Sequence, residues 1–273
     1  MKNKILKLSA LALMLGTCTA GASDNITSPM GGRDTKAIAE ESERVGKMAA
    51  DWLIAHPEIV EQALQKLDEK RREEMHLAQM KTVIEHQENL LSNPDTPATG
   101  PRNAGVAVVE FFDYQCIFCA QMARELKKVM ADRQDVRYLF REWPIFASRW
   151  PVSALAAERG QAIWKTRGAE GYMTYHNALF STGHQEGKLT EDDVEKASRQ
   201  AGYVPERITS SQQDLEETEQ LARTLGAGGT PLLIVMPQKG ATPDRISLIQ
   251  GFVTAEQIEE AIRKAEGKND EQE

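Results

Sequence analysis

Two cysteines, Cys116 and Cys119, are separated by two residues in the segment 110–120. Thiol–disulfide exchange needs an attacking thiolate and a second thiol nearby that resolves the mixed disulfide. If the pair opens a helix, one turn brings the sulfurs within bonding distance, and the helix dipole lowers the pKa of the first thiol. The spacing therefore favours a redox pair in which Cys116 is the nucleophile and Cys119 is the resolving thiol.

Half of a zinc site is the main alternative for this spacing, and it would require two further ligands. The chain has no second cysteine pair, and the nearest downstream histidines, His176 and His184, lie far from the motif in sequence. We therefore expect no metal site and no cofactor. A Cu(I) ion held by the two thiolates stays open as a side activity.

The third cysteine, Cys18, lies in a segment with the features of a secretory signal peptide. Two lysines precede a short apolar stretch, Ile5–Gly16, and small residues at 20–22 have the spacing of a cleavage site. A lipoprotein signal that uses Cys18 is the alternative. Export places the remaining cysteine pair where disulfides form. A bridge that closes so short a loop stabilises a fold only weakly, so a redox role explains the pair better than a structural one.

Composition narrows the class of protein. The chain has 273 residues, 41% of them hydrophobic and 27% charged, which is ordinary for a globular protein. Its formal net charge is -8, whereas a nucleic-acid surface needs clustered excess Lys and Arg. We expect no nucleic-acid partner.

Residues 23–92 are predicted to form a helical arm. Apolar residues recur at helical spacing around Trp52, and Pro57 fits the first turn of a second helix that extends to about Leu91. A helix of that length, ~50 Å, exceeds the width of a small domain. Its apolar stripe therefore needs a partner, and we expect a homo-oligomer, a dimer rather than a trimer. The alternative is a two-helix hairpin that folds back on its own domain.

A block with three prolines, residues 93–104, is interpreted as a linker. Beyond it, strand patterns cover Val106–Phe112, Val136–Trp143, Leu232–Met236 and Arg245–Gln250. A helix is expected to begin at or just after Cys116, and another to cover about 254–266. The segment 149–226 has helical patterns throughout. We expect a catalytic domain over 105–267 and a disordered tail over 268–273.

This order of elements, with the cysteine pair after the first strand and Gly-Thr-Pro before a late strand, resembles the thioredoxin fold. The helical insertion and the Phe-Phe-Asp-Tyr sequence before Cys116 resemble the DsbA family, in its DsbA/Com1-like branch. The fold class implied is α/β, a thioredoxin fold with an inserted helical domain, preceded by an α-helical oligomerisation region. The resemblance also implies that Pro231 is a cis-proline facing the cysteines, and that the backbone of Thr230 pairs with a bound peptide.

The resemblance implies a further role for Glu110, as a buried acid that transfers protons for Cys119. Burial of an unpaired carboxylate is unfavourable, so the alternative is that Glu110 faces solvent on an edge strand. Asp113 is interpreted as a turn or cap residue. The pair Ile117-Phe118 departs from the dipeptides common in the family, and we expect a less depressed Cys116 pKa and a shift toward reduction or isomerisation.

With its arm, the chain is similar to plasmid-encoded DsbP-type and suppressor-of-copper-sensitivity C type disulfide isomerases. The activity implied is a periplasmic protein disulfide isomerase or reductase acting on misfolded or reduced exported proteins. The implied redox partner is a membrane thiol reductase of the DsbD/ScsB type. A DsbA-like dithiol oxidase is the alternative enzyme. A non-catalytic oligomeric chaperone or copper-binding protein is the alternative from another class.

Overall fold

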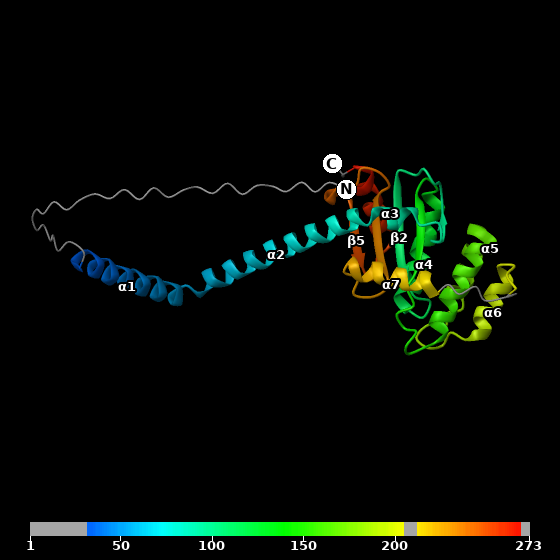
Figure 1. Cartoon of the computed structure of the whole chain (residues 1–273), viewed down its shortest axis with the longest axis horizontal. Coiled ribbons are helices and arrows are strands. Elements are labelled where there is room, and N and C mark those ends of the chain that lie inside the picture. Colours follow the sequence, from blue (N-terminus) through cyan, green and yellow to red (C-terminus); the bar gives the residue numbers. More distant parts are fainter. Residues whose placement is uncertain (1–31, 205–211, 269–273) are drawn as a thin grey trace, which may run out of the picture. The chain divides into compact units, whose positions relative to one another are not determined.

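The computed structural model describes residues 32–204 and 212–268 (Figure 1). The expected signal peptide, with Cys18, lies outside these residues, and so does most of the expected tail. The chain divides into two compact units, residues 1–66 and 67–273. Within the described residues, no helix is both long enough and apolar enough to cross a bilayer.

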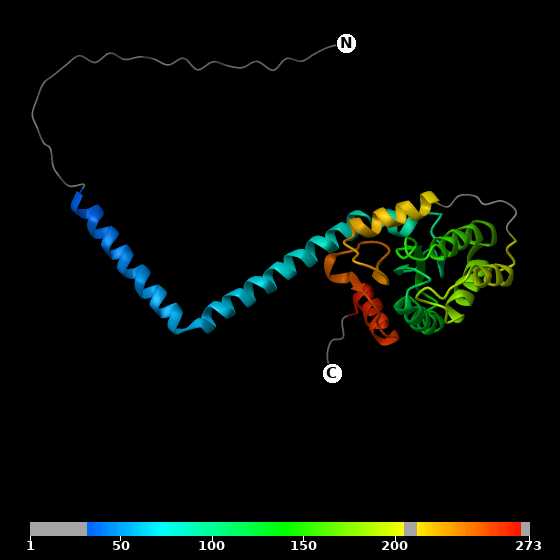
Figure 2. The ribbon, with the colours of Figure 1, turned by 90° about the horizontal axis from the view of Figure 1, so that it is seen from below.

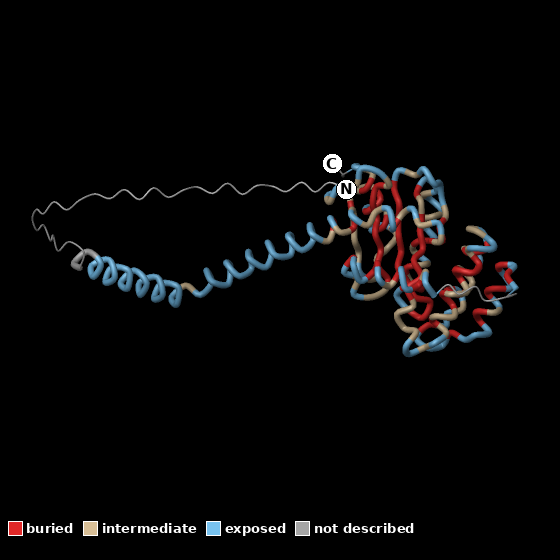
Figure 3. Tube along the Cα trace, in the orientation of Figure 1, coloured by how far each residue is buried: buried red, intermediate tan, exposed pale blue. Residues whose placement is uncertain are grey.

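The first unit contains helix α1, Gly32–Ala55, and the beginning of helix α2, Pro57–Glu85. His56 separates the two helices, and its ring stacks on that of Trp52 with the centroids 4.5 Å apart. Nearly every residue of 35–66 is exposed, as Figure 3 shows along these helices. We call residues 35–66 the exposed helical segment. Its large exposed apolar residues are Ile38, Val45, Met48, Trp52, Leu53, Ile54, Ile59, Val60 and Leu64.

The second half of α2 belongs to the second unit, where Met80 and Val83 are buried. The helix ends at Glu85, and a short helix α3, Gln87–Ser92, follows His86 and buries Leu90. The prediction of one helix over 57–91 is therefore wrong at its C-terminal end. The expected end of the helical arm at residue 92 also lies too far along the chain, because Met80, Val83 and Leu90 are part of the core of the second unit.

A five-stranded sheet forms the centre of the second unit, in the order β1-β3-β2-β4-β5. Strand β2, Val106–Phe112, is buried along its whole length and matches the predicted strand. It runs parallel to β3, Arg137–Glu142, and antiparallel to β4, Leu232–Pro237. Strand β5, Ser247–Gln250, pairs antiparallel with β4, after a 3₁₀ turn over Pro243–Arg245.

The predicted linker contains the remaining strand. Residues Ala98–Thr99 form β1, which pairs antiparallel with Leu139 and Tyr138 of β3. The interpretation of 93–104 as a plain linker is therefore wrong. Prolines exclude a central strand, but Pro97 accepts a backbone hydrogen bond through its carbonyl from Phe140 at 2.8 Å, which an edge position permits.

Alternate residues of β2 point into two apolar cores on opposite faces of the sheet. Val108 and Phe112 join the core formed with α4, Ile117–Asp132, and α8, Ala255–Glu266. Val109 and Phe111 join the core that contains Met80, Leu90 and part of α7, Gln212–Thr224. Figure 2 shows helices on both faces of the sheet. The cysteine pair lies on the α4 face.

The predicted insertion consists of α5, Val152–Ser181, α6, Glu191–Gln200, and α7. Gly168 interrupts α5 with φ +63°, a conformation that only glycine adopts readily. Helices α5 and α6 pack against each other beside the sheet (Figure 1). The loop that joins them, residues 182–190, returns to the start of α4.

Candidate active site

Cys116 is the N-cap of α4, and its sulfur accepts a hydrogen bond from the backbone N–H of Cys119 at 3.4 Å. The strand-to-helix turn that positions it is closed by a hydrogen bond from the Cys116 N–H to the carbonyl of Asp113 at 3.0 Å. Both cysteines are free thiols and both are buried. The predicted helix start is confirmed, and the sulfur of Cys116 lies where the helix dipole favours negative charge.

The two thiols differ in acidity. The pKa of Cys116 is lowered to about 6, first by a hydrogen bond with the Cys119 side chain and further by the backbone N–H groups of Cys119 and Phe118. Burial acts in the opposite direction. Burial, together with the same thiol–thiol hydrogen bond, raises the pKa of Cys119 well above its ordinary value. The pair therefore offers one thiolate near neutral pH and one thiol that keeps its proton.

Asp113 fixes the turn before the cysteines. One carboxylate oxygen accepts a hydrogen bond from the N–H of Gln115 at 2.8 Å. The other accepts hydrogen bonds from the N–H of Phe146 at 2.9 Å and from the Ser153 hydroxyl at 2.7 Å. Asp113 is thus a turn residue, as expected, and it also ties the turn to the first residues of α5.

Glu110 is on the central strand β2 and is buried, so the alternative of a solvent-facing edge position is wrong. Neither carboxyl oxygen has a hydrogen-bond partner within the described residues. Burial, assisted by the charge of Cys116, raises the pKa of Glu110 to about 8. In turn, the charge of Glu110 contributes to the raised pKa of Cys119. The carboxyl is therefore a protonated group near both sulfurs at neutral pH.

The Thr230–Pro231 peptide bond is cis, which is the geometry that the resemblance implied. Pro231 directly precedes β4, and the Thr230 carbonyl accepts a hydrogen bond from the Cys116 thiol at 3.5 Å. The structure thus brings Cys116, Cys119, Glu110 and this loop together. The carbonyl of Pro231 accepts a hydrogen bond from the N–H of Gly251 at 2.8 Å, which joins the loop to the end of β5.

Apolar side chains near the cysteines are exposed. Ile117 is 39% exposed and Phe118 is 54% exposed, although they follow a buried cysteine. Phe252, which is 39% exposed, comes directly after Gly251 at the cis-proline loop. Sequence reasoning missed Phe252, because a lone phenylalanine after a strand has no distinctive pattern.

A second buried acid, Glu142, lies at the end of β3, and sequence reasoning missed it too. Its Oε1 accepts hydrogen bonds from the hydroxyl of Tyr172 at 2.9 Å and from that of Tyr114 at 3.3 Å. Burial raises the pKa of Glu142 well above its ordinary value. The cluster connects the turn before Cys116 with helix α5.

The histidines weighed as metal ligands have other partners. His176 is buried among aromatic rings, where burial lowers its pKa to about 3, and its Nδ1 lies 3.5 Å from the Tyr114 hydroxyl. Nδ1 of His184 is 2.9 Å from a carboxylate oxygen of Asp193. In the described part of the chain, no three His, Cys, Asp or Glu side chains are grouped as metal ligands.

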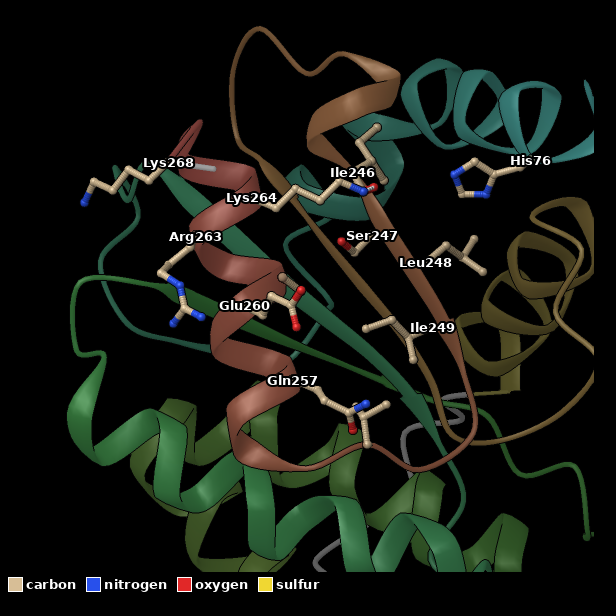
Figure 4. A pocket seen from close by; sticks show the side chains of 12 residues that line it. His76, Ile246, Ser247, Leu248, Ile249, Gln257, Glu260, Arg263, Lys264 and Lys268 are labelled. Carbon is tan, nitrogen blue, oxygen red and sulfur yellow. Dashed lines mark hydrogen bonds between the residues drawn. The ribbon is translucent and has the colours of Figure 1, made fainter. Parts of the chain in front are cut away.

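A groove of about 570 Å³ lies elsewhere, between β5 and α8 (Figure 4). Its lining includes the apolar Ile246 and Leu248, with Glu260, Arg263 and Lys264 on α8. It contains no cysteine, and the Lys264 ammonium is already bonded to the carbonyl of Ile246 at 2.9 Å. Thiol chemistry therefore belongs to the start of α4 and not to this groove.

Residues 98–266, more than half of the chain, match the family described as a thioredoxin-like domain. The chain belongs to the thioredoxin-like domain family. The match begins at β1 and ends with α8, so it contains the cysteine pair, the cis-proline loop and the whole insertion.

Among solved structures, this family member is similar to BcfH of Salmonella enterica Typhimurium, with 34% identity and a TM-score of 0.72. That alignment covers 86% of this chain and 99% of BcfH. A linker-deletion mutant of Proteus mirabilis ScsC has 22% identity and a TM-score of 0.61, over 85% of this chain and 97% of that one. A periplasmic thioredoxin-like protein from Salmonella enterica serovar Typhimurium has 24% identity and a TM-score of 0.55, over 65% of this chain and 94% of that one.

One curated relative is the Na⁺/H⁺ antiporter NhaA 3 of Salinispora tropica, which is 25% identical over 175 residues. The alignment covers 62% of this chain and 26% of that protein. The chain thus spans about a quarter of the length of this relative, and the antiporter name carries no argument about the thiol site.

Proposed function

We propose that this chain is a periplasmic thiol:disulfide interchange protein that acts on exported proteins as an oligomeric disulfide isomerase or reductase. The observation that carries the proposal is the asymmetric pair at the start of α4. Cys116 has a pKa lowered to about 6, and Cys119 beneath it keeps its proton. A thiolate at neutral pH is the nucleophile that exchange requires.

In the proposed reaction, the Cys116 thiolate attacks one sulfur of a substrate disulfide. A mixed disulfide forms, and the other substrate sulfur leaves as a thiolate that takes up a proton. In isomerisation, a different substrate thiolate attacks the substrate sulfur of the mixed disulfide, so that a new substrate disulfide forms and Cys116 leaves as a thiolate. In reduction, Cys119 attacks Cys116, so that the protein gains the disulfide and the substrate leaves with two thiols.

Glu110 is proposed to handle the proton of Cys119. The resolving thiol must lose its proton before it attacks, yet burial raises its pKa well above the ordinary value. The Glu110 carboxyl is buried, has a pKa of about 8 and has no hydrogen-bond partner within the described residues. Its minor ionised fraction near neutral pH would accept the Cys119 proton, and its protonated form would give a proton back.

The substrate is proposed to be an extended peptide with apolar side chains. Ile117 and Phe118 supply exposed apolar surface beside Cys116. The Thr230 backbone contacts the Cys116 sulfur, and we propose that it pairs with a peptide bound across the cis-proline loop. Misfolded and reduced chains expose both apolar side chains and unpaired backbone.

The proposal includes a homo-oligomer, with a dimer favoured over a trimer. The exposed helical segment carries many large apolar residues that nothing covers in the single described chain, and a second copy of the same segment would bury them. An oligomer would place several active sites around one client. A membrane thiol reductase of the DsbD/ScsB type is the proposed electron source, because isomerisation needs a reduced Cys116.

Recovery of activity from scrambled ribonuclease, beside oxidation of reduced ribonuclease, tests the activity. We expect the wild type to restore the scrambled enzyme and Cys116→Ser to give only background. Cys119→Ser is the matched variant, since it keeps the nucleophile and should accumulate mixed disulfides with the client. Oxidation without isomerisation would instead support a DsbA-like oxidase, which the lowered Cys116 pKa also favours. Full biological activity of the double serine variant would support a non-catalytic chaperone, whereas a copper carrier that uses the two thiolates would lose its activity in that variant.

Light scattering on Leu64→Glu tests the oligomer. Leu64 is 56% exposed in the exposed helical segment, and a charge there should reduce the measured mass toward that of one chain. Gln65→Glu adds the same charge at the next position and is expected to leave the mass unchanged. A wild-type mass equal to one chain contradicts the oligomer. Deletions should end before Leu67, because Met80, Val83 and Leu90 belong to the catalytic core.

A further inference from the structure

The loop between α5 and α6 is attached to the residue that precedes Cys116. The N–H of Glu186 donates to the Gln115 carbonyl at 2.9 Å, and the N–H of Gly187 donates to the Gln115 side-chain oxygen at 2.8 Å. Glu186 has φ +56°, a left-handed conformation that is uncommon for a residue with a side chain. The loop thus holds an unusual backbone conformation at a position 70 residues along the chain from Cys116.

That conformation places the Glu186 carboxylate at the first turn of α4. The N–H of Ile117 donates to Oε1 of Glu186 at 3.3 Å. Ile117 is the first residue of α4, so its N–H has no partner inside the helix and contributes to the positive end of the dipole. The sulfur of Cys116 accepts from the N–H of Cys119 at the same helix end. A carboxylate and a thiolate therefore share one helix terminus.

We propose that Glu186 is a positioning residue that makes the cysteine pair less oxidising by placing a carboxylate at the α4 N-terminus beside Cys116. The inference deepens the proposed function and rests on the exchange activity assigned there. The carboxylate neutralises part of the terminus and repels a thiolate on Cys116. It has no comparable effect when Cys116 is in a disulfide, which is uncharged. It therefore disfavours the reduced thiolate relative to the disulfide.

Other acids around the pair do not duplicate this position. Glu110 is buried beneath the sulfurs, with a carboxyl that keeps its proton at neutral pH. Asp113 has both oxygens engaged by the turn and by α5, and the Glu186 charge contributes to its raised pKa. Among these three acids, Glu186 is the exposed one and directly contacts the first N–H of α4.

The test is the redox equilibrium of the full chain with glutathione. In that reaction the Cys116 thiolate and the Cys119 thiol reduce one glutathione disulfide. The protein disulfide forms, and two glutathione molecules leave, one as thiolate and one as thiol. Glu186→Gln removes the charge and keeps the size and an acceptor oxygen. We expect about a threefold to tenfold shift toward the reduced protein, the size expected for one charge near a protein surface.

Four tests separate this effect from a change in folding. Ultraviolet absorbance of the thiolate should show a lower Cys116 pKa in Glu186→Gln, and added salt should shrink the difference between variant and wild type. Glu191→Gln, an exposed acid on α6 in the same insertion, removes the same charge and should leave the equilibrium unchanged. Glu186→Gly, which suits the left-handed backbone, should shift the equilibrium in the same direction as Glu186→Gln.

An equilibrium within twofold of wild type in Glu186→Gln would overturn the proposal, and so would an equal shift in Glu191→Gln. Either result would leave the proposed function intact, since the wild-type pair would still exchange. If the wild-type pair does not exchange with glutathione at all, the proposed function fails, and the role of Glu186 fails with it.

Discussion

Two buried acids on neighbouring strands, Glu110 and Glu142, show how similar burial leads to different chemistry. Both face the α4 side of the sheet, and burial raises both pKa values. Oε1 of Glu142 accepts hydrogen bonds from the hydroxyls of Tyr114 and Tyr172. Neither oxygen of Glu110 has such a partner in the described part of the chain, and the charge of Cys116 acts on it instead.

The difference indicates which acid is available for proton transfer. A carboxyl bonded to two hydroxyl donors is fixed in position, and it also satisfies the polar groups around it. A carboxyl without donors is unfavourable for stability and is retained where its proton has a use. Glu142 therefore belongs to the framework of the site, and its contrast with Glu110 supports the role that we propose for Glu110 in the reaction.

Glu142→Ala should give the largest effect of the variants that test this comparison. Truncation leaves a cavity and two buried hydroxyls without their acceptor, so we expect a loss of about 4 kcal/mol in the free energy of unfolding. Urea denaturation measures it. Glu142→Gln keeps an acceptor oxygen and should lose far less. An equal loss of free energy of unfolding in both variants would show that Glu142 stabilises the fold through its charge and not through its hydrogen bonds.

Gly160 supplies a control for the same region. A Cβ built on Gly160 of α5 would lie 2.1 Å from Oε1 of Glu142, whose position the two tyrosines fix. Gly160→Ala should therefore destabilise the wild type. In Glu142→Ala the methyl group added by Gly160→Ala would enter vacated space. The double variant should therefore lose less free energy of unfolding than the two single variants lose together. Simple additivity would contradict the close approach.

Glu110→Gln should give the opposite outcome. It removes a buried ionisable group that has no hydrogen-bond partner among the described residues, so the free energy of unfolding should stay the same or rise. Resolution of a mixed disulfide by Cys119 should slow by about a hundredfold, at the low end of the range for loss of a general base. Quenched-flow trapping of the mixed disulfide measures this rate. A variant that resolves at the wild-type rate would remove the reaction role from Glu110.

The pH dependence of stability tests the protonation state of Glu110 directly. The pKa of Glu110 is about 8 in the folded chain against an ordinary 4.5, so its contribution is fully present below pH 4.5 and is lost as pH rises to about 8. The difference between wild type and Glu110→Gln should fall across this window by at most about 1.4 kcal/mol per pH unit. Urea denaturation of the reduced proteins at several pH values measures it.

Cys116 contributes to stability with the opposite sign. Its pKa is about 6 in the folded chain against an ordinary 9.0, so its stabilisation is present above pH 9 and is lost as pH falls through 6. This pH dependence occurs in both the wild type and Glu110→Gln, so it largely cancels in the difference between their free energies of unfolding. A difference that stays flat from pH 4.5 to 8 would show that Glu110 is not protonated in the folded chain.

Local patterns predicted the centre of the site well. The apolar run of β2, the start of α4 at Cys116 and the loop at Pro231 are each encoded within a few neighbouring residues. The family resemblance added the cis bond and pointed to a buried Glu110, which composition alone left open between core and solvent.

The features that sequence reasoning missed depend on distant contacts. Arg141 and Glu142 are adjacent charged residues at the end of β3, and only the packing of α5 shows that Glu142 lies among tyrosines. Glu186 meets Ile117 across 69 positions, and no periodicity encodes such a contact. Strand β1 was missed because it has only two residues and lies among prolines. So short a strand at a sheet edge has no alternating pattern of apolar and polar residues.

Strand β1 has a consequence for the proposed function, in which the protein handles unfolded chains. Without it, β3 would be the border of the sheet, with unpaired N–H and C=O groups beside a buried core. Such a border is a template on which an extended foreign segment can add as a further strand and nucleate aggregation. Ala98–Thr99, with the Pro97 carbonyl, already occupies part of that border. Under the proposed function, the short strand would therefore keep clients off this border of the sheet and favour the rim around Cys116 as the place where they bind.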